Sequence, residues 1–233
     1  MEFIVKIDKE KLMNRFVLLL GGIMLLSSCK EKDKLDQFSV VYDVEFIATW
    51  SASTHPTDFP SNAHFSPIVA VSHLASEALF IPGLNASEAV QELAETGKTD
   101  KMNKAIEKWL NTSIAIDQAE GSSFDSPGMS GKLQIGVREG YQTVTTMTMI
   151  APSPDWFISA TTSLLDPSDG LWYDEVISHA IAYDAGTDSG VSFTSPDEAS
   201  IPVQGLSYLN SGPLTEGSDT VVNIGYFRFT RIQ

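Results

Sequence analysis

Two aspartates lie four positions apart in the stretch Y-D-A-G-T-D-S-G, residues 183–190. Asp and Thr side chains hydrogen-bond to nearby backbone, and Gly supplies a positive φ, so this stretch by itself favours an ordinary turn. Carboxylate oxygens are also the ligands that Ca²⁺ prefers, with about six to eight oxygens around each ion. Taken alone, residues 183–190 are therefore either a turn or half of a cation cage whose other half lies elsewhere.

Other residues of catalytic or metal-binding type form weaker patterns. His55, His64 and His73 recur every nine residues, which matches no compact zinc-ligand spacing, so structural histidines are favoured over a zinc site. Ser51, His55 and Asp58 lie too close together within one loop for the geometry of a catalytic triad. The sequence contains no G-x-S-x-G motif and no candidate catalytic cysteine, so a hydrolase would lack its activated nucleophile.

The N-terminal segment has the order of features of a secretory signal. Residues 15–29 read R-F-V-L-L-L-G-G-I-M-L-L-S-S-C: a basic residue, an apolar run too short to span a bilayer, and small residues before a cysteine. The last four of these residues resemble a bacterial lipoprotein box, in which the peptide is cleaved before an acylated cysteine. We therefore expect residues 1–28 to be a signal peptide and Cys29 to be lipidated. Residues 1–12 would be a gene-start artefact if translation begins at Met13.

The expected tether, residues 29–37, contains the charged run K-E-K-D-K and resembles the tethers of Bacteroidetes surface lipoproteins. The expected location is the bacterial cell envelope, as an outer-membrane lipoprotein held to the membrane through Cys29. This cysteine is the only one in the chain, so no internal disulfide or Cys-based zinc site can form. From Cys29 onward the chain carries 11 Lys and Arg against 27 Asp and Glu, a balance that repels nucleic acid and suits divalent cations.

The remaining residues, 38–233, are predicted to form one mainly β domain. Alternating β-branched and aromatic residues predict strands at 38–50, 132–137, 142–150, 156–163 and 221–232. Residues 51–68 are rich in Pro, Ser and Asn and are predicted as loop. Residues 86–117 show helical spacing broken around Gly97. The expected fold is an antiparallel β-sandwich with this short helical insertion at one edge.

Three segments together resemble the spondin N-terminal domain, a module of F-spondin-like extracellular matrix proteins and of many bacterial secreted proteins. They are residues 46–60 with 64–68, A-P-S-P-D-W at 151–156, and Y-D-A-G-T-D-S-G at 183–190. Residues 83–97 fit the helical stretch of the same family, and the resemblance runs from about Val40 to Thr230. The chain lacks the cysteines of animal members and the thrombospondin-type repeats that often follow, which puts matrix-type partners in doubt.

The resemblance implies a β-sandwich that binds one Ca²⁺ through Asp155, Asp184 and Asp188. Three carboxylates within about 5 Å of one another would repel by roughly 3 kcal/mol per pair at an effective dielectric constant of about 20. A dication compensates this repulsion, and Gly186 allows the loop to bend so that Asp184 and Asp188 face one point. With Asp155 added by the resemblance, the cage becomes the favoured interpretation of residues 183–190.

The expected function is binding and not catalysis: a calcium-binding, lipid-anchored envelope module of adhesion type, with an extracellular protein or glycan as ligand. The alternative is a carbohydrate-active enzyme or carbohydrate-binding accessory module, in which acidic residues act as acid and base. Trp50, Trp156 and Trp172 would then be candidates for stacking on sugars, although tryptophans of a sandwich more often belong to its core. A purely structural envelope protein is the third interpretation.

Overall fold

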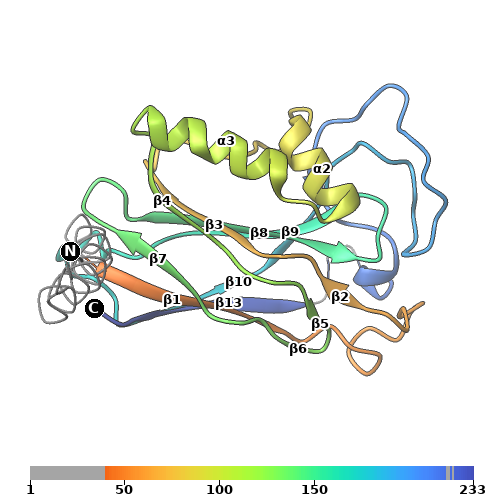
Figure 1. The fold of residues 1–233 in the computed structure, drawn as a ribbon. Helices are drawn as coiled ribbons and strands as arrows, with labels where there is room; N and C mark the ends of the chain where they lie inside the picture. The colour runs from red at the N-terminus through yellow and green to blue at the C-terminus, as the bar shows by residue number, and fades with distance from the viewer. Residues whose placement is uncertain (1–39, 219–220, 222) are drawn as a thin grey trace, which may run out of the picture. The chain divides into compact units, whose positions relative to one another are not determined.

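Two antiparallel sheets face each other in the computed structural model, which describes residues 40–218, 221 and 223–233 (Figure 1). Strands make up 39% and helices 13% of the structure, so the predicted mainly β sandwich is confirmed. The expected signal peptide, the charged tether and Cys29 lie outside the described residues. Within the described part of the chain, no helix is long and apolar enough to cross a membrane.

The smaller sheet is built around β1, which corresponds to the strand predicted at residues 38–50. β1 pairs with β13 along one side, from Tyr42 opposite Arg231 to Ala48 opposite Gly225, and with β7 and β6 along the other. β10 pairs with the far side of β13. The strands of this sheet are β1 Val40–Ala48, β6 Gly128–Met129, β7 Leu133–Val137, β10 Glu175–His179 and β13 Gly225–Arg231.

The larger sheet has the order β12-β11-β9-β8-β2-β5, with β3 also paired to β8 and β4 paired to β3. The longest of its strands, β8 and β9, match the predicted strands at 142–150 and 156–163. The strands of this sheet are β2 His64–Phe65, β3 Val69–His73, β4 Ala115–Glu120, β5 Phe124–Asp125, β8 Thr143–Ala151, β9 Trp156–Ser163, β11 Ile181–Asp184 and β12 Ser207–Tyr208.

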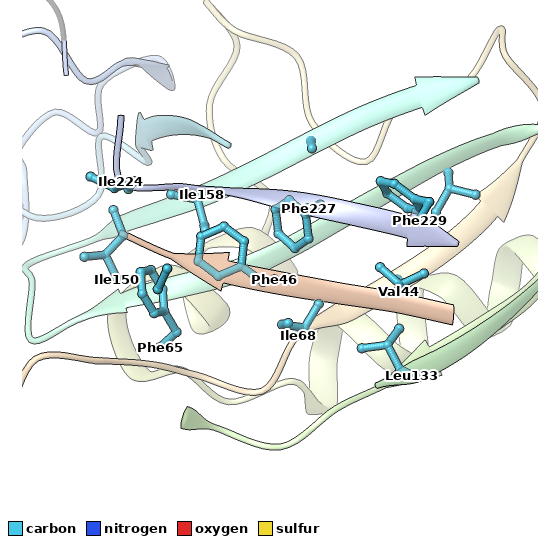
Figure 2. Packing of buried hydrophobic residues seen from close by; sticks show 14 of the residues in the cluster. Val44, Phe46, Phe65, Ile68, Leu133, Ile150, Ile158, Ile224, Phe227 and Phe229 are labelled. Atoms are coloured by element: carbon cyan, nitrogen blue, oxygen red, sulfur yellow. The ribbon is translucent and has the colours of Figure 1, made fainter. Parts of the chain in front are cut away.

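Aromatic and branched side chains from both sheets fill the space between them (Figure 2). The ring of Phe46 on β1 lies 5.0 Å from that of Phe65 and 4.7 Å from that of Phe227, between centroids. Trp50 and Trp156 are fully buried in the same cluster. The expectation that these two tryptophans belong to the core is confirmed, and they present no face to a sugar.

The helical insertion covers the outer face of the larger sheet, and the expectation that it lies at one edge is wrong (Figure 1). Helix α2, Glu88–Thr96, begins at the Ser87 cap and ends at Gly97, which has a left-handed φ of 67°. Helix α3 spans Asp100–Asn111. Both helices bury apolar side chains in a second cluster against the sheet. The helix-to-helix break at Gly97 is confirmed, whereas the last residues of the range 86–117 belong to β4.

Burial on two faces explains why the sequence did not predict β3. All five residues of β3 are buried, because Ala70 faces the sandwich core while Val69 and Val71 face the helices. A strand covered on both sides loses the alternation that identifies a half-exposed strand. The short strand β2 lies within the predicted loop 51–68, and β4, β5, β6, β10, β11 and β12 were likewise not predicted. The 3-10 helix η1 spans Pro213–Thr215.

His73, one of the three evenly spaced histidines, is a buried structural residue at the end of β3. Its Nδ1 lies 2.8 Å from the Leu74 carbonyl oxygen and its Nε2 lies 2.8 Å from the Thr145 hydroxyl. A neutral ring satisfies both contacts, with Nδ1–H donating to the carbonyl and Nε2 accepting from the hydroxyl. Burial lowers the pKa of His73 below its ordinary value of 6.5, although the Leu74 carbonyl and Glu77 act in the opposite direction.

We expect His73 to make the folded protein lose stability as the pH falls below about 6.5. The unfolded chain takes up the imidazole proton in that range, and the folded state does so only at lower pH because its pKa is lowered. The stability contributed by neutral His73 is therefore present above the unfolded pKa and lost on acidification. Urea unfolding of wild type and His73→Gln at about pH 7.5 and 5.5 tests this. Equal pH dependence in the two proteins would contradict it.

Candidate functional site

Asp155 is fully buried immediately before β9, and one of its carboxylate oxygens fastens two distant loops together. Oδ2 accepts hydrogen bonds from the Thr187 backbone N–H at 2.7 Å, the Thr187 hydroxyl at 3.2 Å and the Asp188 backbone N–H at 3.0 Å. The Asp155 carbonyl accepts a further bond from Ala185 N–H at 3.1 Å. The A-P-S-P-D-W segment is thus bound directly to the stretch 183–190.

The other oxygen of the same carboxylate, Oδ1, is buried and has no hydrogen-bond partner in the described residues. Burial, followed by the charge of Asp184, raises the pKa of Asp155 from 3.8 to about 6. The three donors on Oδ2 lower the pKa but do not offset these two effects. Burying an ionised carboxylate with hydrogen bonds to only one of its oxygens costs free energy of folding. A proton or a bound cation would remove this cost.

Asp184 and Asp188 lie on either side of Gly186 and are held by backbone N–H groups. Oδ1 of Asp184 accepts from Gly186 N–H at 2.7 Å. Asp188 accepts from Gly190 N–H at 2.7 Å through Oδ1 and from Glu198 N–H at 2.8 Å through Oδ2. Burial raises the pKa of Asp184, and the charge of Asp188 adds to the rise. The turn chemistry expected of this stretch is therefore present, together with a set of partly buried carboxylates.

Gly186 allows this loop to lie flat against residues 198–204. Its φ is 73°, and a Cβ placed there would be 2.5 Å from the Gln204 carbonyl oxygen. Gln204 N–H donates to the Gly186 carbonyl at 2.9 Å, and Ser200 N–H donates to the Thr187 carbonyl at 2.9 Å. The backbone contact is so close that only glycine fits at this position.

The structure brings the three predicted ligands to one place without forming a ready-made cage. The Asp155 carboxylate accepts a hydrogen bond from the backbone N–H of Asp188. The negative charge of Asp184 contributes to the raised pKa of Asp155, and that of Asp188 contributes to the raised pKa of Asp184. Within the described ranges, no three acidic, His or Cys side chains group closely enough to hold a metal ion as they stand. The calcium ligand set therefore stays a prediction.

Two acidic residues that the sequence did not single out lie beside these aspartates. Glu95, near the end of α2, and Asp197 line a hollow of about 150 Å³ together with Asp188. Thr187 was also not singled out, although it supplies two of the three donors to the Asp155 carboxylate. Only the fold places Glu95 here, because its helix is far from the other residues in sequence. Asp197 lies in a stretch of Ser, Pro and Asp that is typical of an ordinary turn.

The other candidate residues have local structural partners. The Ser51 hydroxyl lies 2.9 Å from the hydroxyls of both Ser53 and Thr54. The His55 Nδ1 lies 2.9 Å from the Thr54 hydroxyl, and His55 is buried. The Nδ1 of His64 lies 2.7 Å from the Asn62 carbonyl oxygen. These contacts agree with the interpretation of the histidines as structural.

Comparison with known proteins gives one family. The Spondin_N family model matches residues 40–218. Spondin-1 of Homo sapiens is 31% identical over 175 residues, which are 73% of this chain and 22% of the relative. Spondin-1 of Rattus norvegicus shows the same values. Spondin-2 of Homo sapiens is 28% identical over 177 residues, which are 73% of this chain and 52% of the relative. The match thus spans about a fifth of Spondin-1 and half of Spondin-2.

We expect Gly186→Ala to lower the free energy of unfolding by roughly 2–3 kcal/mol. The left-handed backbone costs a non-glycine residue about 1 kcal/mol or more, and the contact with the Gln204 carbonyl adds strain that an open position would not. Gly140→Ala is the matched control, because Gly140 has a φ of 86° and a Cβ added there would meet nothing within 4 Å. Chemical denaturation measures both variants, and equal losses would show that the contact with residue 204 is unimportant.

Proposed function

The chain belongs to the spondin N-terminal domain family, and on this premise we propose that it is a calcium-binding, lipid-anchored binding module of the bacterial cell envelope. The observation that carries the calcium part is the buried Oδ1 of Asp155, which has no hydrogen-bond partner among the residues that the structure describes. Oδ2 of the same carboxylate is already satisfied by three donors. A cation bound at Oδ1 would complete the coordination of a group that is otherwise costly to bury ionised.

Asp184 and Asp188 are the two carboxylates that we propose join Asp155 in such a site. Each accepts backbone N–H bonds that hold its orientation, and a carboxylate oxygen that accepts one N–H keeps lone-pair capacity for a metal. Backbone carbonyls and water would complete the coordination of Ca²⁺, which tolerates irregular geometry at about 2.3–2.6 Å. Mg²⁺ fits less well because it demands near-ideal octahedral geometry and keeps its waters.

A binding role is favoured over catalysis. Spondins are secreted, non-enzymatic proteins of the extracellular matrix, and we extend that role to this chain as a proposal, with an extracellular protein or glycan as its ligand. Burial of Trp50 and Trp156 argues against the carbohydrate-active alternative, because two of its three sugar-stacking candidates are core residues. Lipid anchoring rests on the sequence around Cys29 alone, and so does the envelope location.

Saturating calcium is expected to raise the melting temperature of the wild-type protein relative to chelator. At about 100 times its dissociation constant, a ligand that binds only the folded state adds about 2.7 kcal/mol. For a domain of this size each kcal/mol corresponds to about 2–4 °C, so the shift is several degrees. Asp155→Asn, Asp184→Asn and Asp188→Asn should each remove most of this response. Differential scanning calorimetry with calcium or chelator measures it.

Asp166→Asn is the matched control for these variants. Asp166 also accepts an N–H bond from the residue two positions ahead, Ser168, at 2.8 Å, but it lies on a separate turn, D-P-S-D-G at residues 166–170. It should keep the full calcium response. Equal wild-type melting temperatures in calcium and in chelator would contradict the calcium proposal, and residues 183–190 would then be an ordinary turn.

Replacement of Cys29 by Ala is expected to release the protein from the membrane fraction. Several acyl chains, each gaining about 0.8 kcal/mol per buried CH₂, hold a protein firmly, whereas a chain without them has no such anchor. Fractionation and metabolic labelling with a fatty acid measure the effect in cells. Undiminished label and unchanged membrane association in the variant would show that Cys29 is not the anchor.

A further inference from the structure

A groove of about 660 Å³ lies between the loop that follows β1 and the connection from β11 to β12. One wall belongs to the H-P-T-D-F-P segment, residues 55–60, which is part of the resemblance to the spondin family and which the proposed calcium site does not use. This volume is within the range of about 300–1,000 Å³ that ligand sites occupy. The lining residues are Pro56, Asp58, Phe59, Pro60, Ser192, Phe193 and Thr194.

The wall formed by residues 55–60 is held in place by hydrogen bonds to other parts of the chain. Thr57 donates its backbone N–H to Oε1 of Glu216 at 3.0 Å and its hydroxyl to Oε2 at 2.6 Å. At the start of the segment, His55 N–H donates to the Ser51 carbonyl at 2.8 Å. The groove is therefore formed before any ligand arrives, which lowers the entropy cost of binding.

Aromatic side chains fix the base of the groove to the sandwich core. The ring of the fully buried Trp50 lies 5.4 Å from that of Phe59 and 5.3 Å from that of Phe193, between centroids. Phe193 is buried, whereas Phe59 is only partly buried. Part of the Phe59 ring is therefore accessible to a ligand in a groove whose other walls include two prolines.

Asp58 gives this groove an uncompensated negative charge. Its side chain is exposed, and among the residues that the structure describes no donor or cation contacts its carboxylate. None of the described lining residues is Lys or Arg. The backbone at Asp58 is left-handed, with a φ of 51°, a conformation that Asp and Asn adopt more readily than most residues. The carboxylate is thus available to a cationic group.

We propose that this groove binds an arginine side chain of a protein partner. The inference rests on the proposed binding function and names its ligand chemistry. A guanidinium group pairs with a carboxylate through two parallel hydrogen bonds and stacks on aromatic rings, which Asp58 and Phe59 supply. The methylene stem of arginine packs on apolar surface, which Pro56 and Pro60 supply. The excess of 27 acidic over 11 basic residues from Cys29 onward also attracts a basic partner.

A neutral glycan matches this groove less well. A sugar hydroxyl can donate to Asp58 but leaves its negative charge uncompensated, whereas a guanidinium donates and neutralises at once. The Ser192 hydroxyl is already engaged, because it lies 3.0 Å from the Ser195 hydroxyl. Lysine also matches less well than arginine, because its ammonium is compact and strongly hydrated and cannot lie flat on the Phe59 ring.

A nuclear magnetic resonance titration of the full chain in the Cys29→Ala background tests the proposal. The probe is Nα-acetyl-arginine methylamide, and the citrulline analogue is the matched neutral ligand, because it has nearly the same shape without the charge. The arginine probe should shift the backbone amide signals of Phe59 and Thr194 in a saturable way, and the citrulline probe should not. No saturable shift at these residues, or equal shifts with both probes, would overturn the proposal.

Three variants locate the contacts. Asp58→Asn keeps a residue suited to the left-handed backbone and should weaken arginine binding by about tenfold, because a charge-assisted hydrogen bond is lost. Phe59→Leu should weaken it by about two- to fivefold through loss of the cation–π contact. Asp100→Asn, which removes an exposed carboxylate at the start of α3, is the control and should bind as wild type does. Equal affinities of wild type and Asp58→Asn would contradict the proposal.

The glycan alternative and the calcium proposal are separated from this result by two further measurements. Saturable shifts of Phe59 and Thr194 with a neutral oligosaccharide such as chitohexaose, undiminished in Asp58→Asn, would assign the groove to a glycan and overturn the arginine proposal. Asp58→Asn should keep the full rise in melting temperature with calcium, since Asp58 is not one of the proposed calcium ligands. The arginine proposal and the calcium proposal can therefore fail independently.

Discussion

The carboxylate of Asp155 is the interaction on which the candidate site depends. Its Oδ2 collects the N–H groups of Thr187 and Asp188 and so fastens the start of β9 to the loop that leaves β11. These two strands are neighbours in the larger sheet, with Asp184 opposite Trp156. Strand pairing brings the loops together, and the buried carboxylate then fixes their relative position. The arrangement leaves Oδ1 buried without a partner in the described residues, which is the reason to expect a cation there.

The two buried clusters, one on each face of the larger sheet, hold the strands beside these aspartates in place. The sandwich core holds Trp156 directly beside Asp155, and the second cluster holds Tyr183 directly beside Asp184. Asp155 and Asp184 therefore adjoin strands whose positions are fixed on both faces of the larger sheet, and Asp188 lies in the loop that follows β11. A site mounted on such strands is more rigid than one mounted on loops alone, which suits a role in structural cation binding.

The smaller sheet has a different character, because only its inner face is covered by the larger sheet. On the other face, buried Glu45 and half-buried Arg228 form an ion pair at 2.8 Å. One of its edges, β7, is closed against β4. The other, β10, is flanked by the segment from β9 to Leu164: Ile181 lies opposite Ser159, and Tyr173 N–H donates to the Leu164 carbonyl at 3.1 Å. The aspartates lie where the chain enters β9 and leaves β11.

Much of the fold could be predicted from the sequence, and for identifiable reasons. β1 shows the alternation of a strand, and Gly97 ends α2 because its left-handed conformation is available to glycine at little cost. The motifs around Asp155 and residues 183–190 pointed to the family that comparison then gave. β3 could not be found in this way, because a strand buried on both faces has no alternation. The short strands β2 and β5 exist only through pairing with distant partners.

The sequence by itself determined which residue types were available for chemistry: three aspartates in recognisable motifs, one cysteine, and no nucleophile motif. Only the tertiary structure decided how the carboxylates are used. Asp155 is satisfied on one oxygen and, among the described residues, unpartnered on the other because Thr187 and Asp188, more than thirty positions away, present their N–H groups to Oδ2. The place of each strand in its sheet was decided in the same way. Whether a strand is central or at an edge depends on which segments pair beside it, and no local pattern records that choice.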